Sequence, residues 1–168
     1  MSPHLFCHDC LGWQVFTVLF TLISFIALKE YLTLAPTRRD DRLVVLFAYV
    51  ALLVSYSAIW IDNYAYFLVT IPVYIFLATA VLLTLSGRTD GFLATAGIMQ
   101  WGMVVCVFNL GHVAFLMRVP EAEVPQAGPA GLVFFLIFIT QLNDVTQYIW
   151  GKLLGRHKIS PHNSPNKT

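Results

Sequence analysis

The sequence predicts an all-α fold, a polytopic integral membrane bundle of about five transmembrane helices. Hydrophobic residues make up 58% of the 168 residues and charged residues only 11%, which is far from the composition of a soluble domain. Long apolar runs recur along the chain. They are continuous and do not alternate with polar residues, which argues against membrane strands. Because lipid offers no hydrogen-bond partners, each run must pair its backbone internally, as a helix does.

Five of these runs are long enough to cross the hydrocarbon core, which takes about 20 helical residues. They lie near residues 11–28, 43–61, 65–85, 91–117 and 130–150. We therefore expect residues 1–150 to form a transmembrane bundle and residues 151–168 to form a basic segment outside it. The connections at 62–63 and 86–91 are short turns, so consecutive helices should be antiparallel.

The basic residues predict the orientation of the bundle, since loops on the cytoplasmic side are enriched in Lys and Arg. One side receives nine of them and the other side only Arg118. The nine are Lys29, Arg38, Arg39, Arg42, Arg88, Lys152, Arg156, Lys158 and Lys167. We expect the N-terminus outside and the C-terminus in the cytoplasm, in the inner (plasma) membrane of a bacterium. The net charge of +1 gives no reason to expect nucleic acid as a partner.

The N-terminal part of the chain offers few functional candidates. Residues 1–10 lack the basic residues of a signal peptide, so the first helix should be retained. Cys7 and Cys10 form a CxxC pair, but without a second pair of ligands it does not predict a zinc site. In the loop 29–42, the charged cluster 38–42 could contact anionic lipid head groups. Pairing among its own side chains is the interpretation we favour.

The fourth run contains the polar residues Gln100, Asn109 and His112. Asn109 and His112 share a helical face at a spacing of three residues. Polar groups within a membrane normally face the bundle or a wet cavity. His112 should lie near the outer end, far from the basic C-terminal segment, so we expect it to make an interhelical hydrogen bond and not to act in catalysis. Cys106 should pack as a small apolar residue.

Polar residues gather where the fifth run ends. Asn143, Asp144, Gln147 and Tyr148 follow the apolar run without a helix breaker. At helical spacing Asp144, Gln147, Tyr148 and Gly151 share one face. This polar face could point into a cleft between helices.

Beyond this face the chain has groups suited to binding phosphate. Three permanent positive charges and one titratable ring follow the apolar span, and Ser-Pro steps hold the last residues in turns or extended. The charges and the ring are Lys152, Arg156, Lys158 and His157, and the last residues add Ser164 and Lys167 as donors. A plainer interpretation is also open, because basic residues flank many membrane helices and Ser/Pro/Lys tails are often disordered.

One stretch of this C-terminal segment resembles a known family motif. It consists of Asp144, Tyr148, Gly151-Lys152, Gly155-Arg156, Lys158, Pro161 and Ser164-Pro165-x-Lys167-Thr168. In this order it resembles the first conserved stretch of the CTP-dependent phosphatidate cytidylyltransferases, or CDP-diglyceride synthases, which are integral membrane enzymes. The segment 23–34, with its pair Glu30-Tyr31, is similar to that family's first core helix, although less specifically.

The resemblance implies transfer of CMP from CTP to phosphatidic acid, with CDP-diacylglycerol and pyrophosphate as products. It implies Mg²⁺ as cofactor, Asp144 and Lys167 as catalytic residues, and Asp144 as a metal ligand. It implies CTP, phosphatidic acid and membrane lipids as partners and is compatible with a homo-oligomer. The substrate-binding residues that it implies are Asn143, Tyr148, Lys152, Arg156, Lys158, Ser164 and Lys167.

Two departures from the family pattern affect these expectations. Gln147 stands where the family usually has a small residue. The family's second signature, which includes a His-Gly-Gly turn, does not occur before Thr168, so we expect this chain to be an inactive fragment of an enzyme. The alternative is a non-catalytic membrane scaffold or regulatory protein whose basic tail binds lipid. A small transporter is disfavoured because no predicted helix pairs ionisable residues at mid-membrane.

Overall fold

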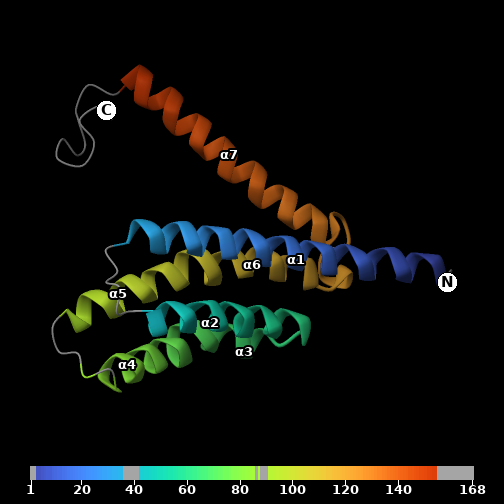
Figure 1. Cartoon of the computed structure of the whole chain (residues 1–168). Helices are drawn as coiled ribbons and strands as arrows, with labels where there is room; N and C mark the ends of the chain where they lie inside the picture. Colours follow the sequence, from blue (N-terminus) through green and yellow to red (C-terminus); the bar gives the residue numbers. More distant parts are fainter. Residues whose placement is uncertain (1–2, 36–41, 86, 88–90, 155–168) are drawn as a thin grey trace. The chain divides into compact units, whose positions relative to one another are not determined.

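The computed structural model describes residues 3–35, 42–85, 87 and 91–154 of the chain (Figure 1). Within these residues every regular element is a helix. Five helices are long and apolar enough to cross a membrane: Gly12–Leu34, Arg42–Trp60, Tyr64–Leu85, Phe92–Arg118 and Gly128–Leu153. The prediction of an all-helical membrane protein with about five spans is confirmed.

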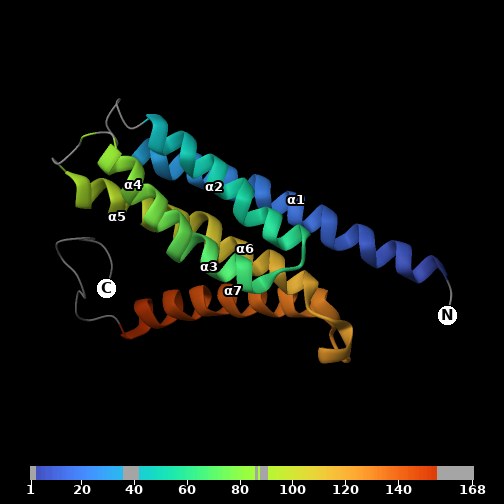
Figure 2. The ribbon, with the colours of Figure 1, turned by 90° about the horizontal axis from the view of Figure 1, so that it is seen from below.

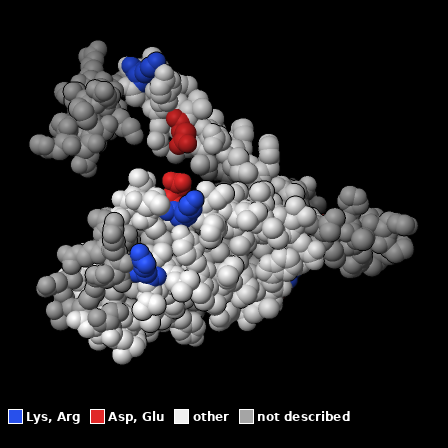
Figure 3. Space-filling view, in the orientation of Figure 1, with Lys and Arg blue, Asp and Glu red and all other residues white. Residues whose placement is uncertain are grey.

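The chain divides into two compact units, residues 1–120 and 121–168. In the first unit, four spans lie side by side as an up-and-down bundle (Figures 1 and 2). Helix α1 (Pro3–Leu34) packs against α2 (Arg42–Trp60) and against the fourth span. Helix α2 also packs against the third span, which completes the bundle. Figure 3 shows that most of the visible surface of this unit carries neither acidic nor basic side chains, as lipid requires.

Helix α1 is longer than the predicted span, which ended near residue 28. It continues to Leu34, so the segment after Lys29 begins as a helix and not as a loop. Lys29, Glu30 and Leu32 are good helix formers. The first residue that cannot continue the helix is Pro36, whose ring disfavours the helical conformation of the residue before it.

The third and fourth spans each contain one wide turn, which the apolar pattern did not predict. The third span consists of α3 (Tyr64–Val69), the wide turn η2 (Thr70–Ile75) and α4 (Phe76–Leu85). In η2 the Phe76 N–H donates to the Ile71 carbonyl, five residues earlier. Pro72 lies inside η2 and has no N–H to donate, so the regular hydrogen-bond ladder cannot pass through it. A local widening of the helix restores the pairing.

The fourth span is built in the same way from α5 (Phe92–Met103), η3 (Val104–Phe108), α6 (Asn109–Phe115) and η4 (Leu116–Arg118). The Asn109 N–H donates to the Val104 carbonyl, again five residues earlier. The two wide turns, η2 and η3, contact each other. The Gln100 side-chain amide donates to the Ile71 carbonyl at 3.5 Å, so the fourth span bonds directly to the wide turn of the third.

The interior of the first unit is almost entirely apolar, and its polar groups are hydrogen-bonded. The hydroxyl oxygens of Ser24 on α1 and Tyr56 on α2 lie 2.6 Å apart, and the Tyr56 hydroxyl also lies 3.1 Å from the Phe20 carbonyl. Both residues are buried. The large side chains with less than 2% exposure include Tyr56, Phe67, Leu28, Leu52, Ile59 and Ile71.

We predict that Tyr56→Phe lowers the free energy of unfolding by about 0.5–1.5 kcal/mol, because it leaves the Ser24 hydroxyl with one fewer partner inside the bundle. Reversible unfolding in detergent micelles measures the change. Ser24→Ala and the double variant complete a cycle in which the double variant should cost less than the sum of the single ones. Strict additivity would contradict the pairing of the two hydroxyls.

At the end of the bundle opposite the turn between α4 and α5, Arg118 ties three spans together. Its guanidinium makes contacts of 3.2 and 3.1 Å to the two carboxylate oxygens of Asp62, between α2 and α3. It also lies 4.1 Å from the centroid of the Trp13 ring on α1. The Trp13 ring meets that of Trp60 edge to face at 5.2 Å. Two indole rings beside a paired arginine are typical of a membrane–water boundary.

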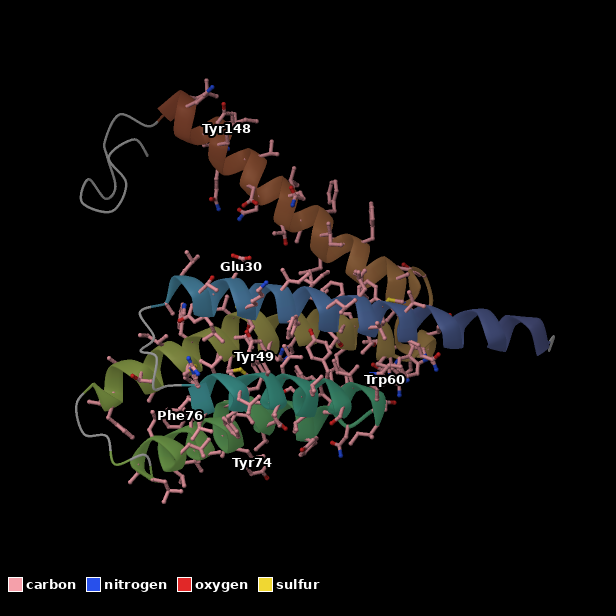
Figure 4. The ribbon with its side chains drawn as sticks, viewed as in Figure 1. Glu30, Tyr49, Trp60, Tyr74, Phe76 and Tyr148 are labelled. Atoms are coloured by element: carbon pink, nitrogen blue, oxygen red, sulfur yellow. The ribbon has the colours of Figure 1, made fainter. Side chains whose placement is uncertain are left out.

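The second unit contains the short helix η5 (Glu121–Glu123) and the long helix α7 (Gly128–Leu154). Gly128 has φ +63°, a conformation that L side chains rarely adopt. Helix α7 contains the fifth span and continues without a break into the predicted polar face. Tyr148 projects from α7 near its C-terminal end (Figure 4).

Candidate functional site

The predicted polar face is present on the C-terminal half of α7. The segment from Asn143 to Lys152 is fully helical, as the absence of a breaker predicted. Asn143, Asp144 and Gln147 are exposed, and within the described part of the second unit their side chains make no hydrogen bond. Thr140, one turn before Asp144, donates its hydroxyl to the Leu136 carbonyl at 2.8 Å. The hydroxyl is thus satisfied locally, and the carboxylate and the two amides remain available for a ligand.

Asp144, Tyr148 and Lys152 form one row along α7, each four residues after the last. Residues at this spacing lie above one another on a helix, and eight residues correspond to about 12 Å along its axis. The Lys152 Nζ lies 4.7 Å from the centroid of the Tyr148 ring. The row therefore places a carboxylate, an aromatic ring and an ammonium in sequence toward the C-terminal end of the membrane-spanning helix.

The residues of this row fit a metal ion only in a limited way. The described residues contain no group of three or more His, Cys, Asp or Glu side chains that could hold a metal by themselves. Asp144 is a single exposed carboxylate. This set suits Mg²⁺, which usually keeps several waters and is bound by one or two carboxylates together with substrate phosphates. It does not suit a metal held by protein ligands alone.

The remaining predicted site residues lie outside the described residues. These are Arg156, Lys158, Ser164 and Lys167. The charged cluster at 38–42 is described only at Arg42, and the side chains of Cys7 and Cys10 are also outside the description. Of the residues that the resemblance implies, the structure therefore places Asn143, Asp144, Tyr148 and Lys152.

His112 needs a correction, because its hydrogen bond is not interhelical. Its Nδ1 lies 2.8 Å from the carbonyl of Phe108, one turn earlier in the same span. The imidazole packs against aromatic rings, with centroid distances of 4.4 Å to Phe108 and 5.0 Å to Phe67 on α3. The contact between spans is thus aromatic, which agrees with a packing role. The interhelical hydrogen bond that we expected at His112 is made by Gln100.

The pair Glu30-Tyr31 on α1 divides between the surface and the interior. Glu30 is exposed and points away from the bundle (Figure 4). The Tyr31 hydroxyl donates to the Ile98 carbonyl on α5 at 2.8 Å, and its ring lies against Gly102, where a Cβ would come within 2.5 Å of it. Tyr31 thus holds α1 against α5. The short spacing between the two helices explains why a glycine occupies position 102.

Comparison with known proteins assigns the chain to a family. Residues 1–168 match the model of the Cytidylyltransferase family. The chain belongs to this family. The match extends over the bundle and the C-terminal segment, and it confirms the resemblance to CDP-diglyceride synthases that the sequence motif indicated.

The chain is also similar to a protein of Escherichia coli (strain K12), "Uncharacterized protein YnbB". The two are 40% identical over 156 residues, which cover 93% of this chain and 50% of the relative. The chain therefore spans about half the length of the curated relative that it matches. No solved structure matches the chain.

Sequence reasoning identified the members of the row on α7 but not the contact between Tyr148 and Lys152. The signal was present, since an aromatic and a basic residue four positions apart on a helix are neighbours. The ion pair between Asp62 and Arg118 had no such signal, because 56 residues separate its members.

Proposed function

We propose that the protein transfers CMP from CTP to phosphatidic acid, giving CDP-diacylglycerol and pyrophosphate. The observation that carries this proposal is the match of the whole chain to the Cytidylyltransferase family. The polar row of Asp144, Tyr148 and Lys152 at the end of an apolar membrane span supports a lipid acceptor. A lipid substrate in the bilayer would present its phosphate at the depth where such a row ends.

In the proposed reaction an oxygen of the phosphatidate phosphate attacks the α-phosphorus of CTP. A new P–O bond forms, the bond from the α-phosphorus to the oxygen bridging to the β-phosphorus breaks, and pyrophosphate leaves with that oxygen. Both substrates are polyanions, so cationic donors are needed to bring them together and to stabilise the charge that develops. Lys152 supplies one such cation, and Arg156, Lys158 and Lys167 would supply others. Ser164 would donate a hydrogen bond to phosphate.

Asp144 would hold a divalent cation together with substrate phosphate oxygens, and Asn143 beside it would contact the substrate. Mg²⁺, when bound, would supply charge neutralisation at the phosphates. Lys152 at the other end of the row would bind the phosphate oxygens that lie farther from the carboxylate. We propose that this end of α7 faces the cytoplasm, where CTP is present, as the distribution of basic residues predicts.

The test is turnover by the protein produced from its complete coding sequence and reconstituted in nanodiscs. With CTP, Mg²⁺ and phosphatidic acid we expect CDP-diacylglycerol and pyrophosphate in equal amounts. Glycerol 3-phosphate, which offers the same phosphate monoester without acyl chains, should give little product. Lipid binding without any turnover would favour a scaffold role, and turnover of the soluble acceptor alone would contradict a lipid substrate.

A further inference from the structure

The contact between Tyr148 and Lys152 suggests a role that the family match does not assign. We propose that Tyr148 is a positioning residue whose ring holds the Lys152 ammonium near the end of α7, in the position from which the ammonium binds a polyphosphate. The proposal rests on the proposed function, since it concerns how one cation of that site is presented.

The first argument is geometric. The Lys152 Nζ lies 4.7 Å from the Tyr148 ring centroid, within the range of about 6 Å at which a cation is attracted to the face of an aromatic ring. Both residues are on the same rigid helix, so their backbones hold the spacing without help from any other element. Lys152 is in the last turn of α7, where the helix dipole also favours a positive charge.

The second argument is the flexibility of the lysine side chain. An exposed lysine has four rotatable bonds and loses much of this freedom when its ammonium is fixed on a phosphate. The ring limits that freedom before the ligand arrives, so less is lost on binding. Tyr148 is 62% exposed. The ammonium on its ring therefore remains accessible on its other side, where a phosphate can bind it while the ring contact is kept.

The third argument is the order of groups in the row. Asp144 lies on the other side of Tyr148 from Lys152, and no ion pair joins the two charged side chains among the described residues. The ring lies one turn before Lys152, so the ammonium that contacts it is directed back along the row, on the face that carries Asp144. The cation and the carboxylate are thus presented to the same polyphosphate.

The proposal predicts a specific effect on substrate binding. Tyr148→Leu removes the ring and should raise the KM for CTP by a factor of about two to five, the range expected for an exposed cation–π contact. The value of kcat should change by less than that factor. Tyr148→Phe keeps the ring and should raise the KM by less than Tyr148→Leu does. An unchanged KM in Tyr148→Leu would overturn the proposal, and so would an equal loss in Tyr148→Phe.

A measurement without catalysis separates this proposal from the proposed function. Reductive methylation with ¹³C-formaldehyde labels amines, among them those of Lys29, Lys152, Lys158 and Lys167, and keeps their charge. The Lys152 methyl protons, assigned with Lys152→Arg, should be shifted upfield by the Tyr148 ring. Tyr148→Leu should abolish this shift and Tyr148→Phe should retain it. A Lys152 signal without the shift, or with a shift that persists in Tyr148→Leu, would overturn the contact whatever the enzyme does.

Titration with pyrophosphate completes the test. The upfield shift should persist when pyrophosphate binds, because the ammonium contacts the ring and the phosphate together. Loss of the shift at saturating pyrophosphate would overturn the positioning role. If the shift is present and survives pyrophosphate binding but no CMP transfer occurs with any lipid acceptor, the proposed function fails while the positioning of Lys152 stands.

Discussion

Replacing Asp144 by asparagine is expected to lower kcat for CMP transfer by at least about 100-fold, because the amide cannot hold a divalent cation beside two polyanionic substrates. Asp144 is the acidic member of the row on α7, and the described residues offer no cluster of carboxylates that could replace it. The measurement is the initial rate of CDP-diacylglycerol formation in nanodiscs over a range of Mg²⁺ concentrations.

Thr146→Val is the matched control for Asp144→Asn. Thr146 lies on the same helix two residues later, and its hydroxyl donates to the Leu142 carbonyl at 2.7 Å. The near-isosteric change should leave the rate within about a factor of two, since an exposed substitution of this kind changes little. Comparable loss in both variants would mean that the helix is disturbed and that Asp144 has no special role. An Asp144→Asn protein with the wild-type rate would remove this residue from the site.

The largest effect on stability should come from Gly111→Ala. A Cβ at position 111 would come within 2.6 Å of Cζ and 2.7 Å of Cε2 of Phe67. Phe67 is completely buried, and its ring stacks on that of Phe108 at a centroid distance of 5.5 Å. Its ring therefore has little room to move, and overpacking of this kind costs about 1–3 kcal/mol. Unfolding in detergent micelles should show a loss in this range.

Gly97→Ala provides the control, because Gly97 is also in the fourth span but a Cβ there would meet nothing within 4 Å. Alanine is the better helix former by up to about 1 kcal/mol, so this variant should be neutral or slightly more stable. The difference between the two variants isolates the contact with Phe67. Phe67→Leu in the Gly111→Ala background should recover part of the loss, and equal stabilities of the two glycine variants would contradict the packing described here.

The membrane spans could be predicted from the sequence because a continuous apolar run in lipid has one solution, the helix. The ends of the spans were less certain, as α1 shows by continuing to Leu34. The wide turns were not predicted. Pro72 is a visible signal for η2, but η3 contains no proline. Close packing fixes the helix before and after η3. Gly102 lies against Tyr31 before this turn, and Gly111 lies against Phe67 after it.

The candidate site could be predicted in part for a similar reason. Helical spacing alone placed Asp144, Tyr148 and Gly151 on one face, because they lie on a single unbroken helix. Arg118 contacts Asp62 and Trp13 because separate spans come together at one end of the bundle. No local sequence pattern predicts such contacts between residues far apart in the chain. For His112 the sequence suggested a hydrogen bond to another helix, because the residue is polar. The bond is instead made to the Phe108 carbonyl in the same span.

The most direct test of CMP transfer is the fate of the phosphorus atoms of CTP. The complete protein in nanodiscs that contain phosphatidic acid is given CTP labelled with ³²P at either the α or the γ position, and the lipids are then extracted. We predict that the α label enters the lipid fraction and that the γ label is found in pyrophosphate. Transfer of the γ label to lipid would show a CTP-dependent kinase, and the absence of both labels from lipid would contradict a lipid acceptor.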